Sequence, residues 1–265
     1  MAKKIRIGAL ISGGGTNLQA IIDACESGRI DGEMVFVGSD NPNAKGLERS
    51  RKHHIPNFVV DYGAIIRGFK NFPDSGMLQA DFSMAEVMSK QSLFPPNTPR
   101  ETVELFLATR AIAEAQLLRA MDEHPFDLLV LAGFMRNLTP YFIDRVNGDG
   151  KLPRIMNIHP ALLPSFPGVD GYGDTYHYGC KVGGCTVHFI DYGEDSGPII
   201  GQRSFSIEPE DTLDRVKEKG LKEEWKLYPE CIRLYAENRL QIVKQTRLLP
   251  GGQQTTRRVV QILTA

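Results

Sequence analysis

Short apolar runs alternate along the chain with stretches of helical periodicity. The apolar run at 5–11 precedes a helical pattern at 17–25, and the same order returns at 34–38 and 46–53. Buried strands joined by amphipathic helices are typical of βαβ units, whose parallel strands are covered by helices on both faces. The pattern therefore predicts an α/β fold with a mostly parallel central sheet.

The remaining elements are predicted from the same two periodicities. Further strands are expected at 58–60, 128–131, 155–158, 185–190 and 198–205, with a candidate edge strand at 257–263. Further helices are expected at 100–123, 140–146 and 212–236, and the segment 247–254 is turn-like. Asn97, Thr98 and Pro99 are start signals for the first of these helices.

The periodicity weakens at 62–99, where Gly, Ser, Asn and Pro recur among isolated apolar residues. This segment is too long for an ordinary loop inside a compact domain. We interpret it as an insertion that is either a folded excursion or a mobile segment. With 265 residues and 42% hydrophobic content, the chain is expected to form a single domain at 1–265, with this insertion and a C-terminal tail at 241–265.

Charge and composition exclude several classes of protein. A formal net charge of −1 gives no overall attraction for nucleic acid or an anionic membrane, although a local basic pocket stays open. No targeting signal precedes the first strand, and its apolar run is too short for a membrane span, so a cytoplasmic location is expected. The four cysteines contain no CxxC pair, which predicts free thiols and no metal site.

The glycine-rich loop SGGGTN at 12–17 lies between the first predicted strand and helix. Three glycines allow close approach of the backbone to a ligand, and the free N–H groups of the following helix suit an anion. The loop lacks the Lys of a P-loop and the spaced third glycine of a dinucleotide fingerprint, so a lone phosphate fits best. A tight turn that needs glycine for structural reasons remains the alternative.

Asn157 and His159 lie at the end of a predicted buried strand. Ligands of a parallel sheet gather where the strands end, and alternation along the strand places these two side chains on the same side. Pro160, Pro164 and Pro167 stiffen the following loop, which favours a fixed catalytic geometry. Taken singly, His159 is equally well explained as a hydrogen-bonded structural histidine.

The turn at 194–198 offers a carboxylate, Asp195, between two predicted strands. An Asp beside a His stabilises the imidazolium and raises its pKa, and an Asn donates a hydrogen bond to a developing oxyanion. Asn157, His159 and Asp195 together therefore suit an acyl-transfer site. Asp is also common in turns for local reasons, and the spacing alone does not establish that Asp195 reaches His159.

These motifs together resemble the folate-dependent glycinamide ribonucleotide formyltransferases, within the wider formyltransferase group. The resemblance covers nearly the whole chain except the insertion and the tail. It is carried by ISGGGTNLQAI at 11–21, GLER at 46–49, LAGFMR at 131–136, NIHP at 157–160, LLPSF at 162–166, TVHF at 186–189 and DSGP at 195–198.

The resemblance implies a Rossmann-like formyltransferase fold and a specific reaction. The formyl group of 10-formyltetrahydrofolate would pass to the amine of glycinamide ribonucleotide, giving formylglycinamide ribonucleotide and tetrahydrofolate in purine (IMP) biosynthesis. By analogy, Asn157 polarises the formyl carbonyl, His159 donates a proton and Asp195 raises the pKa of the histidine. No metal is implied, and a homodimer is left open.

The resemblance also assigns substrate contacts, residue by residue. Glycinamide ribonucleotide would meet Gly15, Thr16 and Asn17 at its phosphate and Leu221, Lys222, Glu223 and Glu224 at its glycinamide end. The folate would meet Arg100 at its glutamate tail, and its pterin would lie among Met135, Arg136, Asn137, Leu138, Asn157, Asp191, Tyr192, Gly193, Glu194 and Asp195. For Met135 and Leu138 plain core packing is the alternative.

The chain departs from the family pattern at several positions, and other functions remain open. Residues 169–176 replace a histidine-containing stretch, Pro167 stands where a lysine is frequent, Asn137 where an apolar residue is common, and Trp225 replaces a histidine. The competing enzyme is a formyltetrahydrofolate hydrolase, and sugar formyltransferases are a weaker match. A catalytically silent folate- or nucleotide-binding regulator is the alternative from another class.

Overall fold

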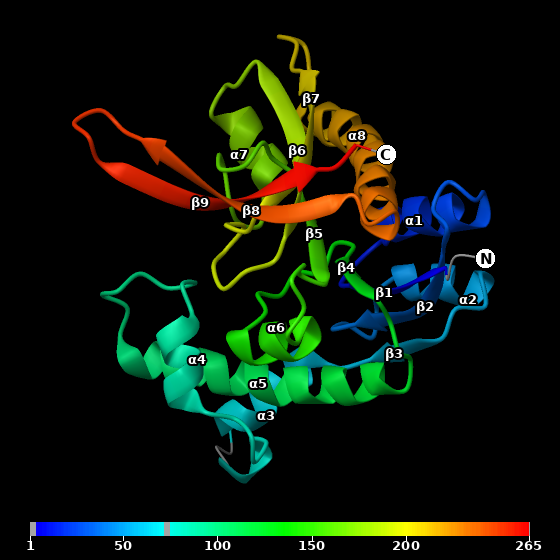
Figure 1. Ribbon diagram of the computed structural model, residues 1–265. Helices are drawn as coiled ribbons and strands as arrows, with labels where there is room; N and C mark the ends of the chain where they lie inside the picture. Colours follow the sequence, from blue (N-terminus) through cyan, green and yellow to red (C-terminus); the bar gives the residue numbers. More distant parts are fainter. Residues whose placement is uncertain (1–3, 72–74, 265) are drawn as a thin grey trace.

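A seven-stranded sheet forms the centre of the protein in the computed structural model, which describes residues 4–71 and 75–264 (Figure 1). The strands follow the order β3-β2-β1-β4-β5-β6-β7, parallel from β3 to β5 and antiparallel at β6 and β7. Their bounds are β1 (Ile5–Ile11), β2 (Gly32–Ser39), β3 (Asn57–Val59), β4 (Leu128–Leu131), β5 (Ile155–His159), β6 (Val182–Phe189) and β7 (Ile199–Ser206). The predicted mostly parallel sheet is confirmed.

Helices cover both faces of the sheet, as the strand pattern predicts. One buried apolar layer joins the sheet to α1 and α8, and another joins it to α5 and α6. The helices are α1 (Thr16–Glu26), α2 (Gly46–Lys52), α3 (Tyr62–Asn71), α4 (Met84–Lys90), α5 (Arg100–Asp122), α6 (Pro140–Asn147), α7 (Gly171–His177) and α8 (Leu213–Ala236). In the part of the chain that the structure describes, no helix is long and apolar enough to cross a membrane.

The segment at 62–99 is a folded excursion. It contains α3, a single 3₁₀ turn at Ser75–Met77 and α4, and it packs against α5. Phe69 of α3 and Val87 of α4 are buried there. Short helices separated by breaks give too few repeats for a clear 3.6-residue pattern, which explains why they were not predicted. Residues 72–74 of this segment lie outside the described part.

Helix α7 was not predicted from the sequence. The side chain of Asp170 caps it by accepting a hydrogen bond from the Gly173 N–H at 3.3 Å. Two glycines in a seven-residue helix oppose helix propensity, and the prolines before it indicate a loop. Tertiary packing compensates, because Tyr172 and Thr175 are buried against neighbouring elements.

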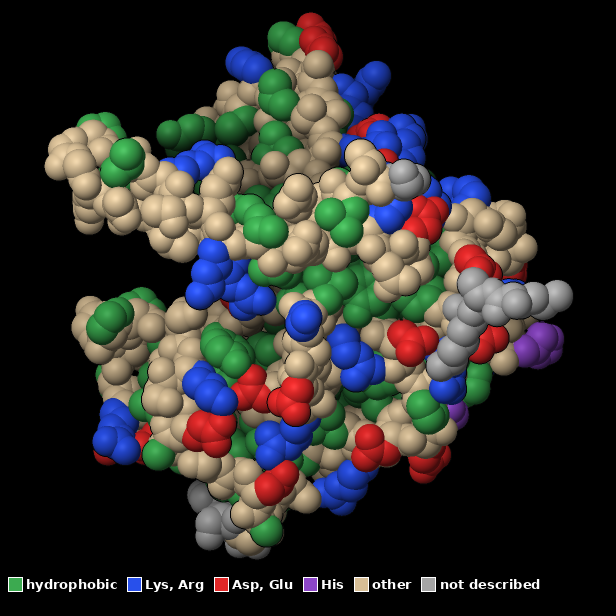
Figure 2. All heavy atoms as spheres, viewed as in Figure 1, with side chains coloured by type: hydrophobic (Ala, Val, Ile, Leu, Met, Phe, Trp, Pro, Cys, Tyr) green, Lys and Arg blue, Asp and Glu red, His purple; other side chains and the backbone are tan. Residues whose placement is uncertain are grey.

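The C-terminal residues form a hairpin of β8 (Leu240–Leu248) and β9 (Gln254–Ile262). The edge strand expected at 257–263 is present, but it pairs with β8 in a separate two-stranded sheet. The turn expected at 247–254 is shorter, because β8 continues to Leu248. The hairpin projects from the body, and a notch separates it from the part formed by α4 and α5 (Figures 1 and 2).

Candidate functional site

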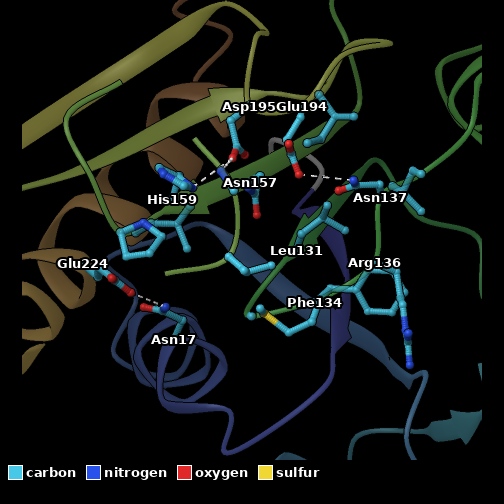
Figure 3. A pocket seen from close by; sticks show the side chains of 18 of the residues that line it. Asn17, Leu131, Phe134, Arg136, Asn137, Asn157, His159, Glu194, Asp195 and Glu224 are labelled. Atoms are coloured by element: carbon cyan, nitrogen blue, oxygen red, sulfur yellow. Dashed lines mark hydrogen bonds and ion pairs between the residues drawn. The ribbon is translucent and has the colours of Figure 1, made fainter. Parts of the chain in front are cut away.

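A cavity of about 340 Å³ opens at the carboxyl ends of β4 and β5. Its walls come from the loop after β4, the end of β5, the loop between β6 and β7, and α8 (Figure 3). Among the residues predicted from the sequence, it is lined by Asn17, Met135, Arg136, Asn137, Leu138, Asn157, His159, Asp191, Gly193, Glu194, Asp195, Leu221 and Glu224. The fold therefore brings the three separate motifs to one place.

The other predicted contact residues lie outside this lining. Gly15 and Thr16 precede Asn17 in the chain, and Lys222 and Glu223 are neighbours of Leu221 on α8. Arg100 begins α5, where its exposed guanidinium pairs with Glu104 at 2.7 Å. Tyr192 lines a neighbouring cavity and donates its hydroxyl to Asp144. A contact of Arg100 with a folate tail stays a prediction.

His159 is held between a carbonyl and a carboxylate at one end of the cavity. Its ring is 3% exposed, and Nε2–H donates to the carbonyl of Phe166 at 2.8 Å. Nδ1 lies 3.2 Å from Oδ2 of Asp195, and the same oxygen accepts the Gly168 N–H at 2.9 Å. Asp195 thus contacts His159 in the fold, which the spacing in the sequence alone did not establish.

Burial changes the protonation of this pair. Burial lowers the pKa of His159 below its ordinary value, and the attraction of Asp195 and the Phe166 carbonyl opposes this without reversing it. Asp195 acts on the pKa of His159 in the expected upward direction, but burial has the larger effect and the net pKa is lowered. Burial raises the pKa of Asp195, but contact with His188, the charge of His159 and the Gly168 N–H together lower it below its ordinary value.

His188 is a site residue that sequence reasoning missed. It lies on β6 directly opposite Asn157 of β5 and is fully buried. The Phe189 carbonyl, 3.0 Å from Nδ1, accepts the Nδ1–H, so in the neutral ring Nε2 accepts from the amide Nδ2 of Asn157 at 3.2 Å. This contact orients the Asn157 amide. The TVHF motif contains the residue, but no spacing rule reveals that β6 pairs with β5.

Glu224 on α8 marks another part of the cavity and is held by two hydrogen bonds. The Asn17 amide and the Tyr172 hydroxyl each donate to it at 2.6 Å. Burial raises the pKa of Glu224 above its ordinary value, against both hydrogen bonds. Tyr172 was not predicted as a site residue, because the stretch at 169–176 departs from the family pattern.

The three loop glycines have different physical requirements. Gly15 has φ +69°, and an added Cβ would lie 2.8 Å from the Cα of Gly46, so the turn itself requires glycine there. An added Cβ at Gly13 or Gly14 would meet nothing within 4 Å. Packing therefore explains Gly15 but does not explain Gly13 and Gly14, which fits close approach of a ligand to this loop.

The cavity wall after β4 combines backbone groups with exposed side chains. Met135 is 56% exposed, so core packing does not explain it, whereas Leu138 is buried. The Met135 N–H donates to the Ser12 hydroxyl at 2.8 Å. Asn137 Nδ2 donates to Glu194 Oε1 at 3.3 Å and so connects this wall with the β6–β7 loop (Figure 3).

Comparison with known proteins decides the family. The model of the formyl transferase family matches residues 5–232. The phosphoribosylglycinamide formyltransferase of Haemophilus influenzae is 34% identical over 93% of this chain and 94% of its own length. The chain belongs to the phosphoribosylglycinamide formyltransferase family. The crystal structure of glycinamide ribonucleotide transformylase 1 from Symbiobacterium toebii agrees, with a TM-score of 0.70, 35% identity, and coverage of 98% of this chain and 94% of that one.

More distant proteins share the fold of this formyltransferase family. A formyltetrahydrofolate deformylase from Pseudomonas putida has a TM-score of 0.65 at 20% identity and is covered over 71% of its length. Identity at this level shows a shared fold only. The phosphoribosylglycinamide formyltransferase of Bacillus subtilis is nearer, at 31% identity over 84% of this chain and 90% of its own length.

Proposed function

We propose that the protein transfers the formyl group of 10-formyltetrahydrofolate to the amine of glycinamide ribonucleotide, as a step of purine biosynthesis. The observation that carries this proposal is one cavity with two chemically different parts. Asn157, His159 and Asp195 gather in one part, and Glu224 with Asn17 borders the other (Figure 3). Such an arrangement suits a donor and an acceptor that meet at the trio.

The acceptor amine attacks the formyl carbon directly. A bond forms from the amine nitrogen to this carbon, and the bond from the carbon to N10 of the folate breaks. The amine loses a proton and N10 gains one. One N–H of Asn157 is occupied by His188, which leaves the other for the formyl oxygen and the oxyanion that develops on it. Proximity and oxyanion stabilisation supply most of the acceleration.

His159 donates a proton during the transfer, and Asp195 stabilises the charged form of His159. The Phe166 carbonyl fixes the proton on Nε2, so a neutral ring turns the lone pair of Nδ1 toward the Asp195 carboxylate. An imidazolium donates to both groups. Burial favours the neutral ring, and the Asp195 charge offsets part of that cost, so the proton is weakly held and ready to transfer.

The glycine loop and α8 bind the acceptor. Gly15, Thr16 and Asn17 begin α1, whose free N–H groups suit the phosphate. Glu224, with Leu221, Lys222 and Glu223 beside it, faces the glycinamide end as the partner of an ammonium or hydroxyl group. The donor lies along the wall from Met135 to Leu138 and the β6–β7 loop. The cytoplasmic location and the absence of a metal stay predictions from the sequence, and a homodimer stays open.

Steady-state assays with purified protein and both substrates test this proposal. The wild type is expected to form tetrahydrofolate, and Asn157→Ala is expected to lose about 10²–10³-fold in kcat, the effect of one oxyanion donor. The matched control is Asn97→Ala, an exposed residue before α5 that does not line this cavity. An unchanged kcat in Asn157→Ala would refute the assigned role. A wild type that binds folate without turnover would favour the silent regulator.

A further inference from the structure

The last residues of the insertion contribute to the wall of the donor cavity. Leu93 is half-buried and lines the cavity beside the β6–β7 loop, which carries Asp195. Its position follows from backbone pairing: the Ser92 N–H donates to the Tyr192 carbonyl at 2.9 Å, and Ser92 forms a parallel bridge with Gly193. The insertion thus reaches the site through ordered contacts.

The chain around Leu93 is held locally. The side-chain oxygen of Gln91 accepts the N–H of Leu93 at 3.0 Å and of Phe94 at 3.2 Å, which turns the backbone toward the cavity. Phe94 then packs edge-on against Phe106 of α5, with ring centroids 5.0 Å apart. These contacts give Leu93 a defined place before any ligand binds.

One carboxylate connects the insertion, α6 and the β6–β7 loop. Asp144 of α6 accepts from the Lys90 ammonium at 2.8 Å and from the Tyr192 hydroxyl at 2.5 Å. Lys90 ends α4, and Tyr192 precedes Gly193, the partner of Ser92. Movement of the insertion would therefore disturb the loop that forms the donor wall.

The start of the insertion supports the opposite wall of the same cavity. Tyr62 of α3 is fully buried, packs edge-on against Phe134 at 6.0 Å between ring centroids, and lies under the guanidinium of Arg136 at 5.6 Å. Phe134 and Arg136 both line the cavity. The end of the insertion thus lines the donor site and its start packs behind residues that line it, although nothing in the sequence pattern of 62–99 indicates this.

We propose that Leu93 is a donor-contact residue, which the insertion adds to the site and which packs against the aromatic part of the folate. The inference rests on the proposed function. An apolar side chain beside Gly193 and Glu194 offers a dry surface to a flat ring, in a cavity that Ile190 and Leu138 also line. Leu93 belongs to the donor part of the cavity, because its anchors are on the β6–β7 loop and not on α8.

Binding of tetrahydrofolate, measured by calorimetry without acceptor, tests the proposal. Leu93→Ala is expected to weaken the Kd about tenfold, equivalent to about 1.4 kcal/mol. Leu93→Met, which conserves volume, should restore binding to near the wild-type Kd. Leu105→Ala is the matched control, because Leu105 is an exposed leucine of α5 outside the cavity lining.

Each outcome separates this inference from the proposed function. A wild-type Kd in Leu93→Ala would overturn the role of Leu93, as would an equal loss in Leu93→Ala and Leu105→Ala. A wild type that binds no tetrahydrofolate would instead refute the proposed function. The KM for glycinamide ribonucleotide should be unchanged in Leu93→Ala, since Leu93 lies on the donor side.

Discussion

The proton on His159 is placed by two opposing influences. The Phe166 carbonyl at Nε2 and the Asp195 carboxylate at Nδ1 both favour a ring protonated on both nitrogens. Burial favours the neutral ring and has the larger effect, so the pKa of His159 lies below its ordinary value. A histidine in this balance changes its charge readily as negative charge develops beside it, which suits proton donation during transfer.

The titration midpoint of His159 should therefore differ in a defined direction between the wild type and an Asp195 variant. In the wild type, the NMR midpoint of its imidazole is expected below the ordinary value of 6.5. Asp195→Asn should lower the midpoint further, because it removes the neighbouring negative charge. Asp122→Asn, at the exposed end of α5, should leave it unchanged. A midpoint above 6.5 in the wild type would contradict this account of the pair.

His188 should act through Asn157. His188→Ala is expected to lower kcat about tenfold, equivalent to about 1.4 kcal/mol, by freeing the Asn157 amide to rotate. In an Asn157→Ala background the same substitution should have no further effect, which a double-mutant cycle measures. The same tenfold loss of kcat in both backgrounds would contradict this. It would indicate that His188 acts on Asp195 instead, since His188 Nε2 lies 3.6 Å from Asp195 Oδ1.

At the scale of single residues, the types of catalytic group were easier to predict from the sequence than the contacts between them. Strand alternation was enough to place Asn157 and His159 together. Asp195 required the loop between antiparallel β6 and β7, where it has a φ of +48° and its carboxylate reaches the histidine. His188 and Tyr172 could not be assigned, because their partners are distant in the chain and are brought close only by sheet pairing and the packing of α7.

At the scale of elements, the junction of α5 and α6 is held by a buried acid. Glu114 of α5 is fully buried and accepts the backbone N–H of Thr139 at 2.8 Å and its hydroxyl at 2.5 Å. Thr139 is the residue before α6, so the carboxylate satisfies a free N–H at this helix start. Burial raises the pKa of Glu114 to about 7.

Glu114→Gln should change how stability depends on pH. Between the ordinary pKa of 4.5 and about 7, the folded protein holds a proton that the unfolded chain has lost, so the free energy of unfolding falls as pH rises. The free energy of unfolding of the variant should not fall in this way. By pH 8 it should exceed that of the wild type by up to roughly 3 kcal/mol. Urea unfolding at pH 5 and pH 8 measures the difference.

The control for this prediction is Glu123→Gln, at the exposed end of α5. It should retain the wild-type pH dependence. If Glu114→Gln also retained the wild-type pH dependence, the prediction would be wrong. The carboxyl of Glu114 in the wild type would then titrate near its ordinary pKa despite its burial.

Elements with a marked apolar pattern were predictable, including the short α2 and β3, and elements without one were not. The seven strands of the central sheet and the helices α1, α2, α5, α6 and α8 follow from apolar periodicity. Helices α3, α4 and α7 have seven to ten residues each and depend on tertiary packing. Strand β8 is mostly exposed, so no apolar face marks it. The antiparallel direction of β6 and β7 is not encoded in the strands' own patterns.

At the scale of the whole molecule, the β8–β9 hairpin stands apart from the catalytic body. Its base packs on the core through Leu240, Ile242 and Val260, while its far half is exposed. Lys and Arg side chains gather at the inner end of the adjacent notch (Figure 2). Lys151 and Arg258 line a cavity of about 280 Å³ beside Tyr192. The balanced net charge of the chain conceals this local basic surface.

Shortening the hairpin should spare both folding and catalysis. Replacing 246–256 by a two-residue turn retains the packed base, so the unfolding midpoint should stay within about 2 °C of the wild type and kcat should be unchanged. Thermal unfolding and steady-state assays measure both, and sedimentation of the two proteins reports whether the far half takes part in a homodimer. A large loss of kcat would place the hairpin in the functional site.

The fate of a labelled formyl group tests the central claim most directly. Purified protein is mixed with 10-formyltetrahydrofolate carrying a ¹³C-formyl group, with and without glycinamide ribonucleotide, and the products are followed by NMR. The account predicts that the label appears on the acceptor amine and that the donor stays intact when the acceptor is omitted. Release of the label as formate without the acceptor would contradict it and identify a hydrolase.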